Sequence, residues 1–394
     1  MSTVPTAAHP APLDLTARLT EVAEVTELHA QRTDRAAEFP VDALGALRRT
    51  GLLGLLVPAE HGGLGGTVAD LVTAAQTLGR SDMSVAMIFA MHCQQSEALI
   101  RHGHERLRKE LLPRIAAGET YLASVTTEAG KGGHLLSAQS QLVDEDGRLV
   151  IDRHAPIVTG GAHADGFLVT MRSAGAATEH EVSLVYAHRD QLDIRASGDW
   201  QPMGMRASHS VALQLTGGAP AHHIVGAPGE FHEIAAKVFG PLAHLGWSAA
   251  WLGTAAGALS RVLRLLRSPA GRERFDLTSE LLLTRLSRAR QRLDTVHALL
   301  QRTLRTVTTG EDLSVPARQL QLNALKLTAS EECLAAVEDL ITALGLRHGY
   351  LQDSPTGLER ALRDLRSAAL NYSNDRLHLA DGRLALRDQG VTFA

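Results

Sequence analysis

The chain has 394 residues, of which 44% are hydrophobic and 21% charged, and its formal net charge is −4. This length and composition suffice for one large or two to three smaller cores and are typical of a soluble globular protein. The mildly acidic balance, without a long basic run, argues against a surface that binds nucleic acid.

Cysteine usage and the first residues bear on the compartment. The two cysteines, Cys93 and Cys333, form no C-x-x-C pair, which excludes a disulfide framework and a cysteine-rich metal site. The first dozen residues lack the charged-then-apolar layout of a signal peptide. We therefore expect a cytoplasmic protein.

Residues 1–120 are predicted to form an N-terminal α-helical domain. Apolar residues recur there at three- and four-residue spacing, with charged residues on the other face. Pro40 stands where helix starts favour proline, so a second helix is expected after it. The glycine-rich stretch 55–67 has no G-K-[ST] after it, which favours a tight loop between helices over a phosphate-binding loop.

Residues 121–228 are predicted to form a middle β-domain. Short alternating runs such as RLVIDR and EVSLVYAH are separated by Gly, Asp and Ser turns, as in an antiparallel barrel or sandwich. The sequence DEDG at 144–147 is typical of the turn that closes a hairpin.

Residues 229–394 return to helical periodicity and are predicted to form a C-terminal α-helical bundle. The run 239–259 has no charged residue and is nearly long enough to cross a bilayer. Its many glycines and alanines make it only weakly hydrophobic, so we predict a buried helix with closely packed neighbours and no membrane span.

Several short motifs in this chain resemble those of one family. TEAGKGG at 127–133 is similar to a family pattern T-E-P-x-x-G-S-D, and APIVTGGAHAD at 155–165 is similar to its K-x-W-I-T-N-G-x-x-A-D. DWQPMGMRASHS at 199–210, LKLTASEE at 325–332 and RDLRSAALNYSND at 363–375 follow in the family's order. Over residues 35–380 the chain thus resembles the flavin-dependent acyl-CoA dehydrogenase superfamily, which includes related two-component flavin monooxygenases.

The resemblance implies an α+β, mainly α fold, with helical domains at 1–120 and 229–394 around an antiparallel β-domain at 121–228. It implies that a flavin lies at the junction of these domains, with Thr127 at its pyrimidine edge and Thr159 at N5. The other flavin-binding residues implied in the β-domain are Val125, Gly132, Gly133, Ile157 and Val158. Ile157 replaces the family's aromatic residue and Gly133 its serine, so a stacking wall and a hydroxyl are lost.

The general base of a dehydrogenase is missing at its usual position. Desaturation of an acyl thioester requires a carboxylate that takes the α-proton while hydride leaves the β-carbon. Tyr372 stands where the usual dehydrogenases have this glutamate, and Trp247 stands near the alternative position in the first helix of the C-terminal domain. Asp375 is the nearest acid in the sequence, and it would share a helical face with Tyr372 if the helix continues.

A monooxygenase needs no such base. It needs a dry, partly polar pocket around its reduced flavin. The resemblance to the two-component monooxygenases places their pocket at the segment where this chain has Asn371, Tyr372, Ser373 and Asn374, with Trp247 opposite. These side chains are compatible with such a pocket.

The cofactor is expected to be FAD, with FMN as the alternative. In the family an R-x-x-F pair of a partner subunit holds the adenosine end, and Arg272 and Phe275 stand at about that position. Family members are dimers or tetramers built through the C-terminal bundle, so we expect a homo-oligomer. No metal site is predicted, because the histidines at 102, 104, 222 and 223 have no third ligand at a suitable spacing.

Three functions are thus open. The leading hypothesis is two-electron oxidation of an acyl thioester on coenzyme A or a carrier protein, because the Thr-Glu-x-Gly-x-Gly segment is closer to the dehydrogenases. The rival is a two-component monooxygenase that uses reduced flavin and O2 on a small molecule. The third is a flavin-free binding protein. The redox partner would be an electron-transfer flavoprotein, O2 or a flavin reductase.

Overall fold

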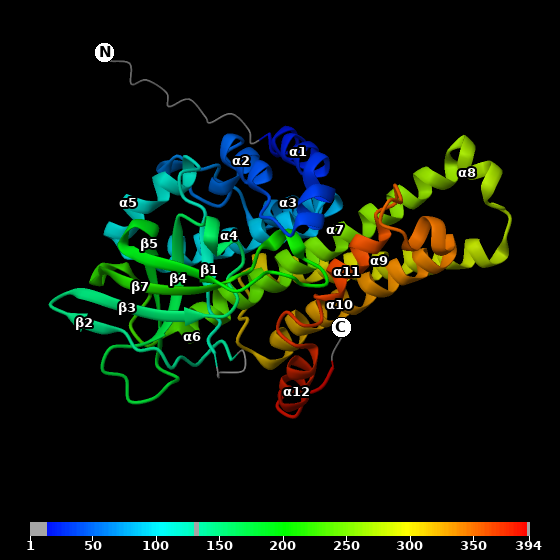
Figure 1. Ribbon diagram of the computed structural model, residues 1–394. Coiled ribbons are helices and arrows are strands. Elements are labelled where there is room, and N and C mark those ends of the chain that lie inside the picture. Colours follow the sequence, from blue (N-terminus) through cyan, green and yellow to red (C-terminus); the bar gives the residue numbers. More distant parts are fainter. Residues whose placement is uncertain (1–13, 130–133, 392–394) are drawn as a thin grey trace, which may run out of the picture.

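The computed structural model describes residues 14–129 and 134–391. Within these ranges a helical block comes first, strands follow, and a second helical block ends the chain (Figure 1). This arrangement confirms the mainly helical fold with a sheet unit in the middle. The boundaries predicted between the three domains, after residues 120 and 228, remain predictions.

Polar side chains cap the N-termini of helices in the first block. Asp14 accepts a hydrogen bond from the N–H of Ala17, and Thr67 forms a reciprocal capping box with Asp70. The glycine-rich stretch between the second and third helices is a tight loop, as predicted, and a Cβ on Gly63 would lie 2.1 Å from the carbonyl oxygen of Val57. The helices are α1 (Leu15–Ala36), α2 (Val41–Arg49), α3 (Val68–Ser81), α4 (Met83–His102) and α5 (Glu105–Ala116).

The described strands form two four-stranded sheets, with the orders β1-β4-β5-β8 and β2-β3-β7-β6. Their bounds are β1 (Leu122–Val125), β2 (Val143–Glu145), β3 (Arg148–Ala155), β4 (Gly166–Arg172), β5 (Val182–His188), β6 (Leu192–Ser197), β7 (Ala212–Pro220) and β8 (Ile224–Val225). The predicted hairpin joins β2 to β3, and Asp146 and Gly147 both have positive φ, as such turns require. The expectation of purely antiparallel pairing is wrong at one place, because β1 pairs with β4 in parallel.

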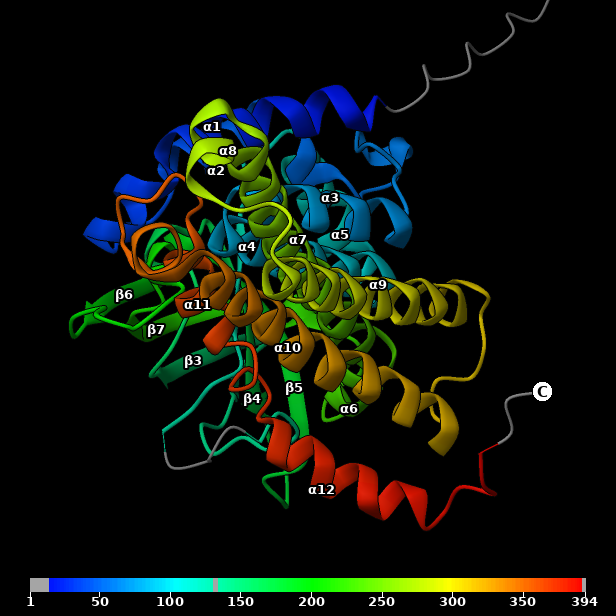
Figure 2. The same ribbon diagram turned by 90° about the vertical axis from the view of Figure 1, so that its right-hand side faces the viewer.

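The second helical block is dominated by three long helices, α7, α9 and α10, which lie side by side (Figures 1 and 2). A π-helical turn, η7 (Ala235–Phe239), leads into α7, and a second one, η8 (Leu346–Tyr350), follows α10. The helices are α6 (Phe231–Ile234), α7 (Gly240–Arg267), α8 (Pro269–Arg274), α9 (Glu280–Thr308), α10 (Pro316–Gly345), α11 (Leu358–Arg366) and α12 (Asn374–Ala385).

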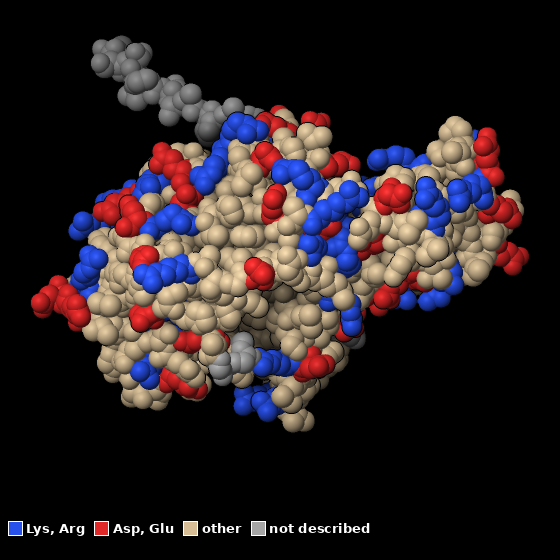
Figure 3. All heavy atoms as spheres, viewed as in Figure 1, with Lys and Arg blue, Asp and Glu red and all other residues tan. Residues whose placement is uncertain are grey.

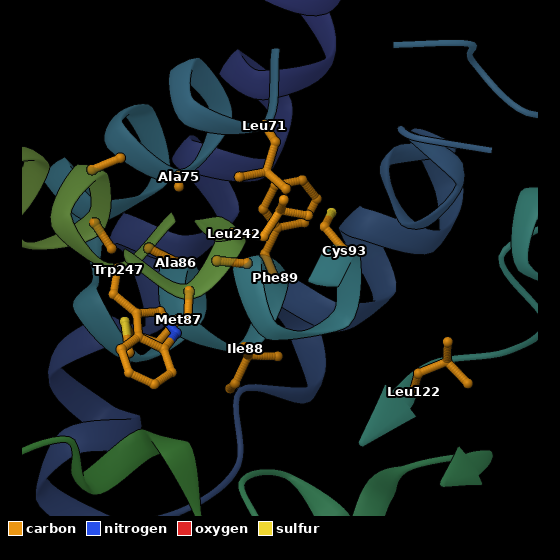
Figure 4. Close-up of a cluster of buried hydrophobic side chains, with 14 of the residues drawn as sticks. Leu71, Ala75, Ala86, Met87, Ile88, Phe89, Cys93, Leu122, Leu242 and Trp247 are labelled. Carbon is orange, nitrogen blue, oxygen red and sulfur yellow. The ribbon is translucent and has the colours of Figure 1, made fainter. Parts of the chain in front are cut away.

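Helix α7 contains residues 240–259 of the uncharged run and packs on α3 and α4 (Figure 4). A Cβ on Gly253 would lie 2.1 Å from the carbonyl oxygen of Gln76, and one on Gly246 would lie 3.0 Å from the Cβ of Ala90. These small residues therefore serve close packing within the chain. The prediction of a buried core helix is confirmed. In the part of the chain that the structure describes, no helix is long and apolar enough to cross a bilayer.

Candidate active site at the junction of sheets and helices

The segments that follow β1 and β3 meet through Thr127 and Ile157. The Thr127 hydroxyl donates a hydrogen bond to the carbonyl oxygen of Ile157, at 2.8 Å. The Ile157 side chain is 51% exposed, which is unusual for a large aliphatic residue. Gly132 and Gly133 lie outside the described residues. Two of the residues that the resemblance assigns to the flavin are therefore in contact, with an uncovered apolar side chain beside them.

A buried ion pair holds Thr127 in place. Arg153 and Glu128 approach to 2.7 Å with side chains that are 0% and 6% exposed, and Arg153 also donates to the carbonyl oxygen of Thr127 at 3.0 Å. Glu128 accepts further hydrogen bonds from Ser140 and from the N–H of Gln139. Although burial opposes it, these hydrogen bonds and the Arg153 charge lower the pKa of Glu128. Arg153 was not predicted as a site residue, because its only signal in the sequence was a charge at an inward position of a predicted strand.

Thr159 lies on a turn that is tied to the segment before β7. Its Oγ1 accepts a hydrogen bond from the Ser210 hydroxyl at 3.1 Å. The next residue, Gly160, has φ of +60°, and a Cβ there would lie 2.5 Å from the Tyr121 hydroxyl. The N–H and C=O of Val158 are both bonded within the chain, and Val125 and Val158 are fully buried. Thr159 thus presents a fixed hydroxyl, while the two valines belong to the framework beneath it.

On the helical side, aromatic side chains converge. The ring centres of Trp247 on α7 and Tyr372 lie 5.1 Å apart, and those of His244 and Tyr372 lie 6.4 Å apart. Trp247 also packs beside Met87 of α4 (Figure 4). Burial lowers the pKa of His244 to about 4, so its imidazole is neutral at pH 7. The predicted proximity of Trp247 and Tyr372 is therefore present, with His244 as an additional neighbour.

The segment that carries Tyr372 is held by a lysine of α10. The fully buried Lys326 donates to the carbonyl oxygen of Tyr372 at 2.9 Å and to Oδ1 of Asn374 at 2.6 Å. The Asn374 amide donates in turn to Ser330 and Glu331. Burial lowers the pKa of Lys326 to about 8. Lys326 and Ser330 are in a motif that the sequence analysis noticed but did not assign to the site.

The helix does not continue from Tyr372 to Asp375, so the expectation that these side chains share a helical face is wrong. Helix α11 ends at Arg366, Tyr372 has φ of 47°, and α12 begins only at Asn374. A left-handed residue cannot be accommodated within an α-helix. Asp375 is exposed in the first turn of α12, whereas Asn371 and Ser373 are half-buried.

Helix α4 connects the two sides of the junction. It packs on β1, on α7 and on the turn η5 (Arg206–Ser208), which ends two residues before Ser210. The Ser84 hydroxyl lies 3.9 Å from Sδ of Met205. The N–H of Met205 donates to the buried Asp364 at 2.6 Å, and burial together with the charge of Asp82 raises the pKa of Asp364 to about 7. The segment 199–210 is thereby fixed to α11 as well as to α4.

Arg272 and Phe275 lie far from this junction. Helix α8 stands at the opposite end of the long bundle from the sheets (Figure 1). The 21 residues of α7 from Trp247 to Arg267 alone span about 30 Å. The ring of Phe275 instead packs near His348 of η8, with ring centres 5.6 Å apart. The two predicted parts of the flavin site therefore do not meet within one chain.

Two helical blocks around a pair of small sheets form the acyl-CoA dehydrogenase fold. The model of the acyl-CoA dehydrogenase N-terminal domain matches residues 16–119, and that of the acyl-CoA dehydrogenase C-terminal domain matches residues 245–375. The chain belongs to the acyl-CoA dehydrogenase superfamily of flavin-dependent oxidoreductases.

Curated relatives are distant. An acyl-CoA dehydrogenase of Bacillus subtilis is 22% identical over 88% of this chain and 88% of its own length. The very long-chain specific acyl-CoA dehydrogenase of Rattus norvegicus is 22% identical over 91% of this chain, which spans only 55% of that protein.

Solved structures share the fold. FMN-bound TdsC from Paenibacillus sp. A11-2, a dibenzothiophene monooxygenase, is 21% identical and superposes with a TM-score of 0.85 over 97% of this chain and 99% of its own. Butyryl-CoA dehydrogenase from Megasphaera elsdenii is 17% identical, with a TM-score of 0.83 over 96% of this chain and all of its own (100%). At these identities the likeness shows the fold and leaves the reaction open between the two classes.

Proposed function

We propose that this chain is a flavin-dependent monooxygenase that takes reduced flavin from a separate reductase and inserts one oxygen atom of O2 into a small-molecule substrate. The observation that carries the proposal is the environment of Tyr372. By its resemblance to the family this residue takes the position of the dehydrogenase base, and its ring lies near those of Trp247 and His244, which are three residues apart on α7. This environment favours the monooxygenase over thioester oxidation, whereas the sequence alone favoured thioester oxidation.

The chemistry of Tyr372 does not suit a general base for an α-proton. Burial raises the pKa of its hydroxyl to about 12, so the group is protonated at pH 7. The site residues in contact with it or its backbone are Trp247, His244 and Lys326. None of the three is a carboxylate.

The residues at the junction fit a flavin. Thr127 and Thr159 offer hydroxyl oxygens, and the exposed face of Ile157 offers apolar surface to a flat ring. The molecular surface is hollowed between the strands and the C-terminal helices (Figure 3). A reduced flavin bound there would supply the two electrons with which O2 is split between product and water.

The protein's own residues would exclude water and hold the substrate. Trp247 and Tyr372 form an aromatic wall, and stacking on such rings favours an aromatic or otherwise flat substrate. Lys326 fixes this wall by holding the backbone of Tyr372 and the side chain of Asn374. Apolar walls of this kind would shield the reaction of reduced flavin with O2 from bulk solvent.

Isotope incorporation tests the proposal. The protein is supplied with a flavin reductase, NADH and ¹⁸O2, and a panel of small aromatic compounds is screened by mass spectrometry. We expect a product that carries one ¹⁸O atom, and none when the protein is omitted. Anaerobic bleaching of the bound flavin by an acyl thioester would contradict the proposal.

Thioester oxidation is the second candidate, because the curated relatives are acyl-CoA dehydrogenases and a solved relative with a TM-score of 0.80 is the prolyl acyl carrier protein oxidase AnaB. In this candidate Asp375 is the base, and the start of α12 must move so that its exposed carboxylate reaches the substrate. Asp375→Asn should then abolish flavin reduction by thioester while flavin stays bound. Unchanged reduction would exclude Asp375.

We further propose that the cofactor is FAD and that the protein is a dimer or tetramer. Arg272 and Phe275 lie about 30 Å or more along the bundle from Trp247, so only a second copy can bring them to the flavin. Light scattering gives the oligomeric state, and chromatography of the acid-released flavin identifies it. Arg272→Ala should weaken FAD binding about tenfold and leave FMN binding unchanged, and equal loss of both would contradict this role.

A further inference from the structure

A group of three metal-ligand side chains lies away from the proposed active site. Glu110 of α5 meets His222 and His223 of the turn η6 (Ala221–His223), and one ligand atom from each residue lies within 4.8 Å of the others. The sequence showed the two histidines without a third ligand. The fold supplies that ligand from a helix far away in the chain.

His223 is oriented as a metal ligand would be. Its Nδ1 lies 3.1 Å from the carbonyl oxygen of Tyr186. A carbonyl oxygen only accepts, so Nδ1 carries the proton and Nε2 keeps its lone pair. Histidine ligands of metals almost always donate their other ring N–H to such a backbone or carboxylate oxygen.

His222 and Glu110 have ligand atoms without another use in the described structure. Nε2 of His222 is buried and has no hydrogen-bond partner there, and it lies 3.9 Å from Oε2 of Glu110. Arg106 donates to the other carboxylate oxygen, Oε1, at 2.9 Å. The unused oxygen of the carboxylate and the unpaired ring nitrogen therefore lie next to each other.

We propose that Glu110, His222 and His223 bind a divalent transition-metal ion of the zinc class and so fasten α5 to the sheet unit. Two imidazoles and one carboxylate are typical zinc ligands, with bonds of about 2.0–2.2 Å that place ligand atoms about 3.4 Å apart. Small side-chain rotations bring the three atoms from their present spacing to that distance. The fourth position is open to water or to His104, whose ring centre lies 6.0 Å from that of His222.

The test uses the full chain, freed of metal by chelation, and titration calorimetry with ZnCl2. We expect one equivalent of Zn²⁺ to bind and to raise the melting temperature, and EDTA to reverse the shift. Glu110→Gln and His222→Ala should each weaken binding at least about tenfold. Glu110 is exposed, so its variant is expected to fold normally.

His180→Ala is the matched control. His180 also lies 3.9 Å from a glutamate, Glu179, but it belongs to no group of three ligands among the described residues. This variant should bind Zn²⁺ as the wild type does. The proposal is overturned if the wild type binds no Zn²⁺, or if Glu110→Gln and His222→Ala bind it as tightly as the wild type.

Discussion

At the scale of single residues, the proposed function depends on Tyr372. Its backbone is left-handed in the segment between α11 and α12, its carbonyl oxygen accepts a hydrogen bond from Lys326, and its ring packs on Trp247. These contacts involve the backbone and the ring of Tyr372 and do not involve its phenolic oxygen. The account therefore assigns the residue a role through its shape rather than through proton transfer.

Substitution of Tyr372 separates shape from proton chemistry. Tyr372→Phe keeps the ring and should retain turnover within about threefold, because the hydroxyl has a pKa of about 12 and does not act as a base at pH 7. Tyr372→Ala removes the wall beside Trp247 and should lower coupling of O2 consumption to product at least about tenfold. The measurement is product formed per O2 consumed, and a loss of more than about a hundredfold in Tyr372→Phe would contradict the account.

The ion pair of Glu128 and Arg153 gives a prediction about stability. Glu128→Gln leaves the guanidinium of Arg153, which is 0% exposed, without its counter-charge. Loss of one partner from a buried pair lowers the free energy of unfolding by about 3–5 kcal/mol. Urea unfolding measures it, with Glu179→Gln as the control because Glu179 is 54% exposed. A loss no larger than that of the control would show that the pair does not fix the Thr127 segment.

At the scale of elements, the segment 199–210 and helix α11 are joined by groups that respond to pH. The pKa of Asp364 is raised from 3.8 to about 7 because the carboxyl is buried and lies near Asp82. A raised carboxyl pKa means that the folded state favours the neutral acid. The stability that this neutral acid contributes is present below pH 4 and is lost as pH rises through about 7.

Asp364→Asn isolates this effect, since the amide oxygen can still accept the hydrogen bond from the Met205 N–H. We expect the free energy of unfolding of the variant, relative to the wild type, to rise by up to about 1.4 kcal/mol per pH unit between pH 5 and 7. Chemical denaturation at several pH values measures the difference. A difference that is independent of pH would mean that Asp364 is not held neutral.

The elements also indicate what a sequence can predict. The hairpin between β2 and β3 was predictable because its turn residues, Asp146 and Gly147, determine a local conformation. The parallel pairing of β1 with β4 was not, because it depends on partners that are distant in the chain. The non-helical segment before α12 was not predicted either. Tyr372 has a left-handed conformation there that tyrosine disfavours, and its carbonyl oxygen accepts a hydrogen bond from Lys326, which is distant in the chain.

At the scale of the whole molecule, the candidate site is assigned to the place where the sheets and the two helical blocks meet, and this assignment began from the family motifs. They did not predict Arg153, His244 or Lys326 as its neighbours, because these side chains reach the site only through tertiary packing. Glu110, the third of the proposed metal ligands, escaped prediction in the same way, because the fold brings it to His222 and His223 from a distant helix. Motifs thus indicated the cofactor class, and the choice between the two reactions rests on the proposal made above for Tyr372 and its neighbours.

The central claim is that the aromatic wall of Trp247 and Tyr372 controls the reaction of reduced flavin with O2. The most direct measurement is anaerobic reduction of the flavin-loaded protein, followed by rapid mixing with oxygenated buffer while the visible spectrum is recorded. The account predicts that reoxidation occurs in two resolved steps, with the second slower than the first, and that Tyr372→Ala merges them into one. Slow single-step reoxidation of the wild type, together with flavin reduction by acyl thioesters, would contradict the account and favour a dehydrogenase.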